Sequence, residues 1–257
     1  MNFNRLPGSI FIYFLSVIIH MEKLKGLDLE GKLVLDAGTG GCNMTKYLEN
    51  WGAKVVSIDI RNDWQVDCKE QTSHTEFITA DLSRMNFLED QVFDYVICNF
   101  VVSALSQTKE LLLSSALREF HRVLKPEGML VVIDYYPFEG DRCPSPCDHL
   151  QVELWRLENA VAELLGQGHL EEFHPDIVGS ELLSMGFKET DTSVLLENVP
   201  WPDDLIADHE EAILKKIDQV EEIYLKDALK LKLRSIIDST KGKRIESGAI
   251  YELRALK

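Results

Sequence analysis

An acid, a glycine-rich turn and a second acid stand in this chain at a spacing that suits the binding of a nucleotide-like ligand. Asp36 ends an apolar run and precedes the turn Gly38-Thr39-Gly40-Gly41, and Asp59 closes a second apolar run about 20 residues later. Glycines let the main chain approach a ligand without a clash at Cβ, and a carboxylate at the end of the neighbouring strand can accept hydrogen bonds from ribose hydroxyls. The pattern predicts a strand–helix–strand unit that binds an adenosine-containing cofactor.

Apolar runs alternate with helical patterns through the first half of the chain, which is typical of a parallel sheet covered on both faces. Strands are predicted at 32–36, 54–59, 75–80, 93–99 and 129–135. Helices are predicted at 43–51, 64–71 and 109–124, with a short turn at 82–86. The turn Lys125-Pro126-Glu127-Gly128 is expected to end the last helix and start the fifth strand.

The second half of the chain has a different pattern of predicted elements, because long helical segments separate its strands. Helices are predicted at 149–165 and 176–185, and strands at 187–196 and 249–256. A helix start at 199–204 opens a long helical stretch that runs to Ser239, and a turn at 241–243 precedes the last strand. Two late strands would extend the sheet of the first half.

This order of elements resembles the class I S-adenosylmethionine-dependent methyltransferases, and the motifs that carry the resemblance lie between residues 32 and 136. They are Asp36 to Gly41, Asp59, Asp81 within Thr79-Ala80-Asp81-Leu82, the strand 93–99, and the helix and turn at 118–130. The resemblance implies an α/β fold with a Rossmann-like sheet of seven strands, mostly parallel with an antiparallel last strand. Helical insertions would cover the substrate edge.

The resemblance also implies a site for S-adenosylmethionine. Asp36 would orient the glycine loop and meet the amino group of the cofactor, Asp59 would accept the ribose hydroxyls, and Asp81 would lie on the adenine side. Each acid also has a structural interpretation as a cap or a strand-end carboxylate. The cofactor-binding residues predicted are Asp36, Ala37, Gly38, Thr39, Gly40, Asp59, Ile60, Asp81, Leu82, Asn99 and Phe100.

One residue departs from the family pattern. Cys42 stands where the family has a third glycine, with Gly41 just before it. We expect Gly41 to supply the backbone freedom that the turn needs. A nicotinamide dinucleotide is the alternative cofactor, but its glycine pattern would place the final glycine at Asn43. Binding of the cofactor without methyl transfer, as in a sensor or an assembly subunit, is a second alternative.

Methyl transfer from a sulfonium is an in-line displacement, so the protein mainly aligns donor and acceptor and excludes water. Asp134 and Tyr135, at the end of the fifth strand, are the candidate catalytic residues, and the alternative is that they only line the pocket. No metal is predicted, because Cys143 and Cys147 with His149 do not show the usual spacing of zinc ligands.

The insertions are expected to set substrate specificity. Residues 138–175 contain eight acids against Arg142 and Arg156. Such a face could attract a cationic small molecule, an amine or a basic protein, or it could simply be solvated. We expect a small-molecule acceptor, with a protein side chain as the alternative. The apolar face of the stretch 202–239 predicts either packing between helices, or a substrate cover or homodimer contact.

Composition limits the other partners. The 257 residues carry a formal charge of -16 without a basic stripe, which argues against nucleic acid. Five scattered cysteines indicate a reducing compartment, the cytoplasm, rather than a disulfide framework. The apolar run 10–19 is too short for a stable membrane span. It is interpreted as a packed helix, as a membrane-touching anchor, or as residues before a true start at Met21.

The expected organisation therefore has four parts. Residues 1–30 form an apolar or helical lead, and residues 31–137 form the cofactor-binding core. Residues 138–175 form a helical insertion or lid, and residues 176–257 complete the sheet domain and include the helical insertion 202–239.

Overall fold

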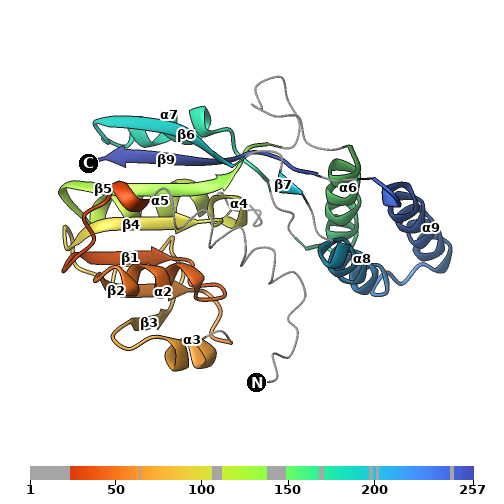
Figure 1. Cartoon of the computed structure of the whole chain (residues 1–257), viewed down its shortest axis with the longest axis horizontal. Coiled ribbons are helices and arrows are strands. Elements are labelled where there is room, and N and C mark those ends of the chain that lie inside the picture. Colours follow the sequence, from red (N-terminus) through yellow and green to blue (C-terminus); the bar gives the residue numbers. More distant parts are fainter. Residues whose placement is uncertain are drawn as a thin grey trace.

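The computed structural model describes residues 24–63, 65–105, 112–137, 149–167, 171–196, 199–200, 203–243 and 246–257. A sheet of seven strands in the order β3-β2-β1-β4-β5-β9-β6 organises the fold (Figure 1). Only β9 runs antiparallel to its neighbours, so the predicted sheet is confirmed. Its strands are β1 (Leu33–Ala37), β2 (Lys54–Asp59), β3 (Glu76–Thr79), β4 (Phe93–Asn99), β5 (Leu124–Tyr135), β6 (Glu189–Leu196) and β9 (Ile250–Leu256).

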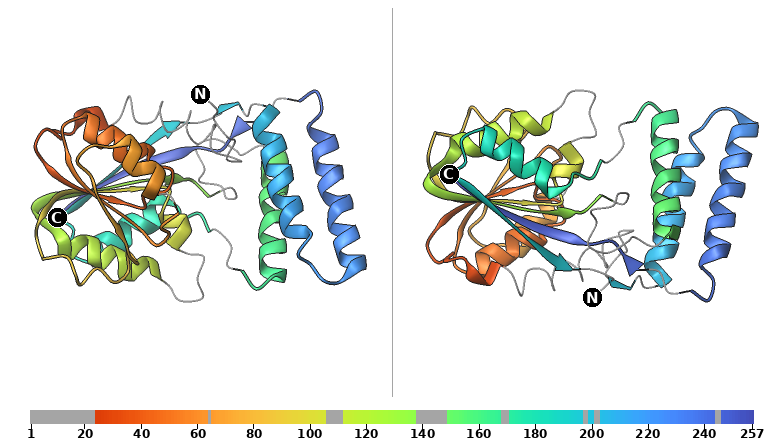
Figure 2. Two further views of the ribbon diagram at one scale, coloured as in Figure 1. Left: turned by 90° about the horizontal axis from the view of Figure 1, so that it is seen from below. Right: turned by 90° about the horizontal axis from the view of Figure 1, so that it is seen from above.

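Both faces of the sheet are covered, which is why its central strands are apolar along most of their length. The short helix η1 (Leu24–Gly26) and α2 (Asn43–Asn50) lie against one face, and α5 (Leu112–Val123) and α7 (Pro175–Ser184) lie against the other (Figure 2). Successive side chains alternate between these layers, so that Val34 packs toward α2 and Leu35 toward α5.

The turn expected at 125–128 lies inside β5 instead. The strand begins at Leu124, directly after α5, and the register with β4 shifts between Phe93 and Tyr95. The backbone of this segment also pairs with the C-terminal residue, because Lys257 N donates to Gly128 O and Glu127 N donates to Lys257 O. Long-range pairing has therefore drawn a local turn motif into an irregular strand.

Three helices form a second body beyond the carboxyl ends of the parallel strands (Figures 1 and 2). This helical layer consists of α6 (His149–Leu164), α8 (Asp203–Ile217) and α9 (Ile223–Thr240). It has its own core, in which Leu154 of α6, Ile213 of α8 and Leu233 of α9 are buried together. The periodic apolar residues of 202–239 thus pack between helices, as one of the two interpretations proposed.

Two details of this insertion differ from the prediction. The helical stretch is broken after α8, and Glu222 starts α9 by accepting hydrogen bonds from the backbone of Tyr224 and Leu225. The expected helix start at 199–204 also begins with a strand, because β7 (Val199–Pro200) pairs with β8 (Glu246–Ser247). This short ribbon joins the two ends of the insertion.

A disulfide joins Cys42 to Cys68, with the Cα atoms 5.6 Å apart. The expectation of cysteines without a disulfide framework is therefore wrong for this pair. Cys42 precedes α2 and Cys68 lies in α3 (Gln65–Gln71), and parallel strands bring both segments to the same edge. A separation of 26 residues gives no local signal of such a contact. Cys98 is a buried free thiol, and residues 143 and 147 lie outside the described part.

Replacing Cys68 by serine should lower the free energy of unfolding by about 3 kcal/mol, because the disulfide restricts the unfolded chain by closing a loop. Denaturation in urea under oxidising conditions measures the difference. Wild-type protein treated with a dithiol should fall to the stability of the variant, and equal stabilities before that treatment would contradict the prediction.

Several expectations fall on residues that the structure does not describe. The apolar run 10–19 and the segment 138–148 are among them, so the interpretation of the N-terminal lead and the domain boundaries stay predictions. Within the described ranges, no helix is both long and apolar enough to cross a membrane.

Candidate functional site

The glycine loop after β1 folds over the end of β2. Gly38 N and Thr39 N both donate to Ile58 O, at 2.8 and 3.2 Å. Gly38 has φ of 94°, and a Cβ atom there would lie 2.3 Å from Cγ2 of Val101. Only glycine fits this position, because both the backbone conformation and the space exclude a side chain.

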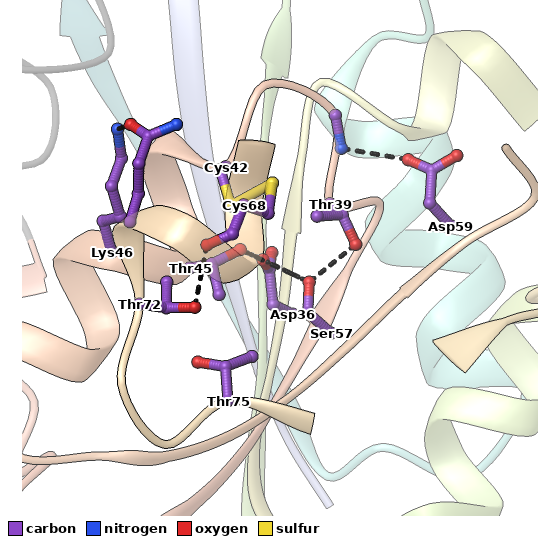
Figure 3. The surroundings of a disulfide bond; sticks show 12 residues. Asp36, Thr39, Cys42, Thr45, Lys46, Ser57, Asp59, Cys68, Thr72 and Thr75 are labelled. Carbon is purple, nitrogen blue, oxygen red and sulfur yellow. Dashed lines mark hydrogen bonds between the residues drawn. A yellow bond between two sulfur atoms is a disulfide. The ribbon is translucent and has the colours of Figure 1, made fainter. Parts of the chain in front are cut away.

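Asp59 fixes the other side of this loop (Figure 3). Its Oδ2 accepts a hydrogen bond from Gly40 N at 2.9 Å, and its Oδ1 accepts one from Arg61 N at 2.9 Å. Each carboxylate oxygen can accept more than one hydrogen bond, so both retain capacity for donors from a ligand. Ile60, the next residue, is 68% exposed beside them. The two predicted parts of the site are in direct contact.

Asp36 is a buried carboxylate with one oxygen left unpaired. Its Oδ2 accepts hydrogen bonds from Thr45 Oγ1 and from Ser57 Oγ (Figure 3). Its Oδ1 is buried and has no hydrogen-bond partner in the described protein. Burial raises the pKa of Asp36 to about 6, against the two hydroxyl hydrogen bonds that lower it. An unpaired carboxylate oxygen at this depth is suited to a cationic group of a ligand.

Cys42 itself supplies the backbone conformation that we expected from Gly41. It has φ of 70° and ψ of 4°, in the left-handed region, and it stands directly before α2. The set of residues with positive φ includes Gly38 and Gly40 but not Gly41. A glycine would adopt this conformation without cost, which explains why the family has one there. In this chain a buried, disulfide-bonded cysteine takes its place.

Asp81 acts as a cap, as its structural interpretation proposed. Its Oδ1 accepts hydrogen bonds from Ser83 N and Ser83 Oγ, both at 2.8 Å. The segment lies beside Asp59, because Ala80 N donates to Asp59 O at 3.0 Å. Leu82 is buried in the core. A contact of Asp81 with adenine is compatible with this geometry and stays a prediction.

The end of β4 carries a second unusual backbone. Phe100 has φ of 56°, and its N donates to Ile133 O at 2.7 Å. Before it, Asn99 has a buried side-chain oxygen without a partner in the described residues. A non-glycine residue in this conformation costs free energy, and such residues concentrate at ligand sites. The Phe100 ring packs against Tyr135, with ring centroids 5.0 Å apart.

Asp134 and Tyr135, the candidate catalytic residues, point to opposite faces of β5. Asp134 is 1% exposed, and its carboxylate accepts hydrogen bonds from Ser103 N at 3.1 Å and Tyr135 N at 2.9 Å. It therefore holds the start of the short helix α4 (Val102–Leu105). Burial raises the pKa of the Tyr135 phenol, which makes ionisation harder. A catalytic role for either residue stays a prediction.

Sequence reasoning missed Glu172, which lies just before α7. Burial raises the pKa of Glu172 to about 8, and the nearby charge of Asp134 acts in the same direction. Nothing in the sequence separates Glu172 from the other acids of 138–175, because only the fold buries it.

Several aromatic rings pack together just after the end of β5. Tyr136 packs edge-on against His174, with centroids 5.5 Å apart, and against Tyr251, with centroids 5.3 Å apart. His174 also starts α7, since its Nδ1 accepts a hydrogen bond from Asp176 N. The described residues hold no group of three or more His, Cys, Asp or Glu side chains that could bind a metal.

The geometry of the glycine loop and its acids is matched by a known family. Residues 35–132 match the family model described as a methyltransferase domain. By sequence the matched core is a methyltransferase domain, and its fold is consistent with the class I S-adenosylmethionine-dependent family. The strand order and the acids at the ends of β1 and β2 agree with this likeness.

Relatives and solved structures support the same family. The methyltransferase core is 30% identical over 95 residues to malonyl-[acyl-carrier protein] O-methyltransferase of Pseudescherichia vulneris, covering 37% of this chain and 36% of that protein. It is 31% identical over 117 residues to ribosomal protein L11 methyltransferase of Aliivibrio fischeri, covering 44% and 36%. The matches thus span just over a third of these relatives.

Solved structures share the fold of this chain over all or nearly all of its length. A cyclopropane-fatty-acyl-phospholipid synthase-like protein from Lactobacillus casei aligns with a TM-score of 0.69 at 12% identity, covering all of this chain and 96% of that one. A SAM-dependent methyltransferase from Archaeoglobus fulgidus aligns with a TM-score of 0.60 at 14% identity, covering 95% and 94%. At these identities the likeness is one of fold.

Proposed function

We propose that this chain is a methyltransferase that uses S-adenosylmethionine. The observation that carries the proposal is the unpaired, buried oxygen of Asp36 beside the glycine loop. The amino group of the cofactor's methionine part is a cation with hydrogen-bond donors, which is what this oxygen lacks. Two ribose hydroxyls match the remaining acceptor capacity of Asp59, next to Gly40. The residues present therefore fit the cofactor.

When bound, S-adenosylmethionine supplies a methyl group on an activated sulfonium. The task left to the chain is to hold the cofactor, orient the acceptor and exclude water. The loop 36–42 and Asp59 would hold the cofactor. Asn99 and Phe100 would line the edge of the sheet where β4 ends. Asp134 positions α4 through backbone hydrogen bonds, so it shapes the acceptor side.

For the acceptor, the site favours a small molecule with an amine or another cationic centre. Glu172 is a partly buried carboxylate just before α7 and near Asp134, and the rings of Tyr136 and His174 pack together close to it in the chain. Carboxylates and aromatic faces together bind ammonium groups well. The helical layer lies beyond this edge of the sheet (Figure 1), where we propose that it restricts the approach of a folded protein substrate. A protein side chain remains the second candidate.

A label assay tests the acceptor. The protein is incubated with methyl-labelled S-adenosylmethionine and either a pool of cell metabolites or a pool of proteins, and the metabolites are then separated on a cation exchanger. We expect the label in the metabolites that the cation exchanger retains. Label only in protein would establish the second candidate, and label in neither pool would favour a protein that binds the cofactor without transfer.

Glu172→Gln should reduce methylation of the labelled acceptor by about tenfold in kcat/KM, with little change in cofactor affinity, because an ion pair to the acceptor is lost. Glu171→Gln is the matched control, since it removes the same charge from an exposed neighbour. The raised pKa of Glu172, about 8, further predicts that wild-type kcat/KM rises with pH through that value. Equal effects of the two variants would contradict the role.

Absence of a nucleic-acid partner, a homodimer and a cytoplasmic location are not tested by the structure and stay predictions. The acidic composition of the chain is the main support for the absence of a nucleic-acid partner.

A further inference from the structure

One face of α2 holds α3 and the turn behind it through three links. Cys42 is bonded to Cys68, Lys46 Nζ donates to Gln71 Oε1 at 2.7 Å, and the Glu49 carboxylate accepts hydrogen bonds from the backbone after α3. Steps of four and three residues place 42, 46 and 49 on the same side of a helix. Only the first link is covalent, and it is the one next to the glycine loop.

The disulfide joins the two segments that flank the ribose acid (Figure 3). On one side, Cys42 N donates to Thr39 O at 2.9 Å, and Gly40 N between them donates to Asp59. On the other side, α3 begins a few residues after Asp59, in the segment whose Arg61 N also donates to it. Any movement of one cysteine is therefore transmitted to the cofactor loop.

The side chains of this pair are also the main anchor of α3. Both cysteines are fully buried, at 0% and 1% exposure. Of the α3 side chains that the structure describes, Cys68 is the buried one, and the others are partly or fully exposed. A helix of seven residues that is held mainly through one buried side chain should shift when that attachment changes.

We propose that Cys42 and Cys68 form a reversible redox modification site that controls cofactor binding. This inference rests on the proposed function, because it concerns regulation of the same site. The reactant is a dithiol reductant. Once local opening of α3 uncovers the buried sulfur of Cys68, one thiolate of the reductant attacks it to form a mixed disulfide, and the released Cys42 thiolate takes a proton. The second thiol of the reductant then displaces the other cysteine, so two electrons and two protons pass to the protein and the reductant becomes a cyclic disulfide.

Reduction weakens the site for a physical reason. Two thiol sulfurs cannot remain as close as two bonded ones, so α3 must withdraw from the loop. Cys42 is then no longer held in a left-handed conformation that L-residues rarely adopt, and the loop around Gly40 and Asp59 loosens. The oxidised form should bind S-adenosylhomocysteine about tenfold more tightly than the reduced form, a size common for coupled sites.

Coupling of this kind is reciprocal. If oxidation tightens ligand binding tenfold, saturating ligand must make reduction of the disulfide tenfold less favourable. For a two-electron couple this corresponds to about 30 mV. An equilibrium with increasing ratios of reduced to oxidised dithiol, measured with and without S-adenosylhomocysteine, therefore gives a second value for the same quantity.

The test uses full-length protein carrying Cys143→Ser and Cys147→Ser, so that no other pair of cysteines in the chain contributes. S-adenosylhomocysteine is titrated calorimetrically into the oxidised and the dithiol-reduced protein, and alkylation with mass measurement verifies each state. We expect the oxidised protein to bind about tenfold more tightly. Cys68→Ser should bind as the reduced protein does, with no response to the dithiol.

The outcomes separate the two proposals. Equal dissociation constants in both states, or tighter binding after reduction, would overturn the redox site and leave the proposed function intact. No binding of S-adenosylhomocysteine in either state would overturn both. If Cys68→Ser does not fold, the comparison of the two states of the protein that retains Cys42 and Cys68, together with the dithiol equilibrium, still decides.

Discussion

Asp36→Asn should weaken S-adenosylhomocysteine binding by about 100-fold, because it removes the charge that would face the ligand's ammonium group. The same substitution should make the protein without ligand more stable at neutral pH. Asp36 is fully buried, and its hydroxyl partners Thr45 and Ser57 can still donate to an amide oxygen. A variant that gains stability and loses binding marks a residue kept for function.

The sign of the stability effect follows from the pKa. Burial raises the pKa of Asp36 from 3.8 to about 6, so the folded protein prefers the protonated acid. The stabilising contribution is fully present below about pH 4 and is lost as pH rises through about 6. At neutral pH the charged form costs on the order of 3 kcal/mol, which asparagine should recover.

Two measurements check this prediction. Denaturation curves at several pH values should show Asp36→Asn above wild type at neutral pH and the difference shrinking toward pH 4. Calorimetry should show wild-type affinity falling as pH drops below about 6, where Asp36 becomes protonated, and no such limb in the variant. Unchanged affinity in Asp36→Asn would contradict the assignment of its free oxygen to the ligand.

Asp59→Ala should also cost about 100-fold in cofactor affinity, since two interactions disappear together. The carboxylate would no longer accept the ribose hydroxyls, and Gly40 N would lose the acceptor that holds the loop. Asp63→Ala is the matched control, because Asp63 is an exposed acid nearby that forms an ion pair with Arg61. Calorimetry with S-adenosylhomocysteine compares the three proteins.

A dissociation constant for Asp59→Ala within about twofold of wild type would refute the ribose assignment. Equal losses in Asp59→Ala and Asp63→Ala would point to general electrostatics in place of a specific contact.

The elements that position the site were predictable because their signals are local. Buried strands such as β1 and β4 are continuous apolar runs, and α5 shows its buried face at helical spacing. Once the strands are parallel, topology alone puts Asp36, Asp59 and Asn99 at one edge. The contact of Asp59 with the glycine loop follows from the same placement.

The features that were missed depend on residues far apart in the sequence. Cys42 meets Cys68 only because the fold brings the start of α2 to α3, and the partial burial of Glu172 near Asp134 likewise depends on the fold. The backbone hydrogen bonds that the Asp134 carboxylate accepts from Ser103 and Tyr135 also could not be read from the sequence. Whether a side chain at the end of a strand contacts a ligand or a neighbouring helix depends on where that helix lies. The sequence pattern does not specify this position.

The cofactor assignment can be tested most directly with the unmodified protein in a calorimeter. S-adenosylhomocysteine and NADH are titrated separately into it under oxidising conditions. We expect S-adenosylhomocysteine to bind with one molecule per chain and NADH to give no binding heat. Binding of NADH without binding of S-adenosylhomocysteine would contradict the assignment of this site to a methyl donor.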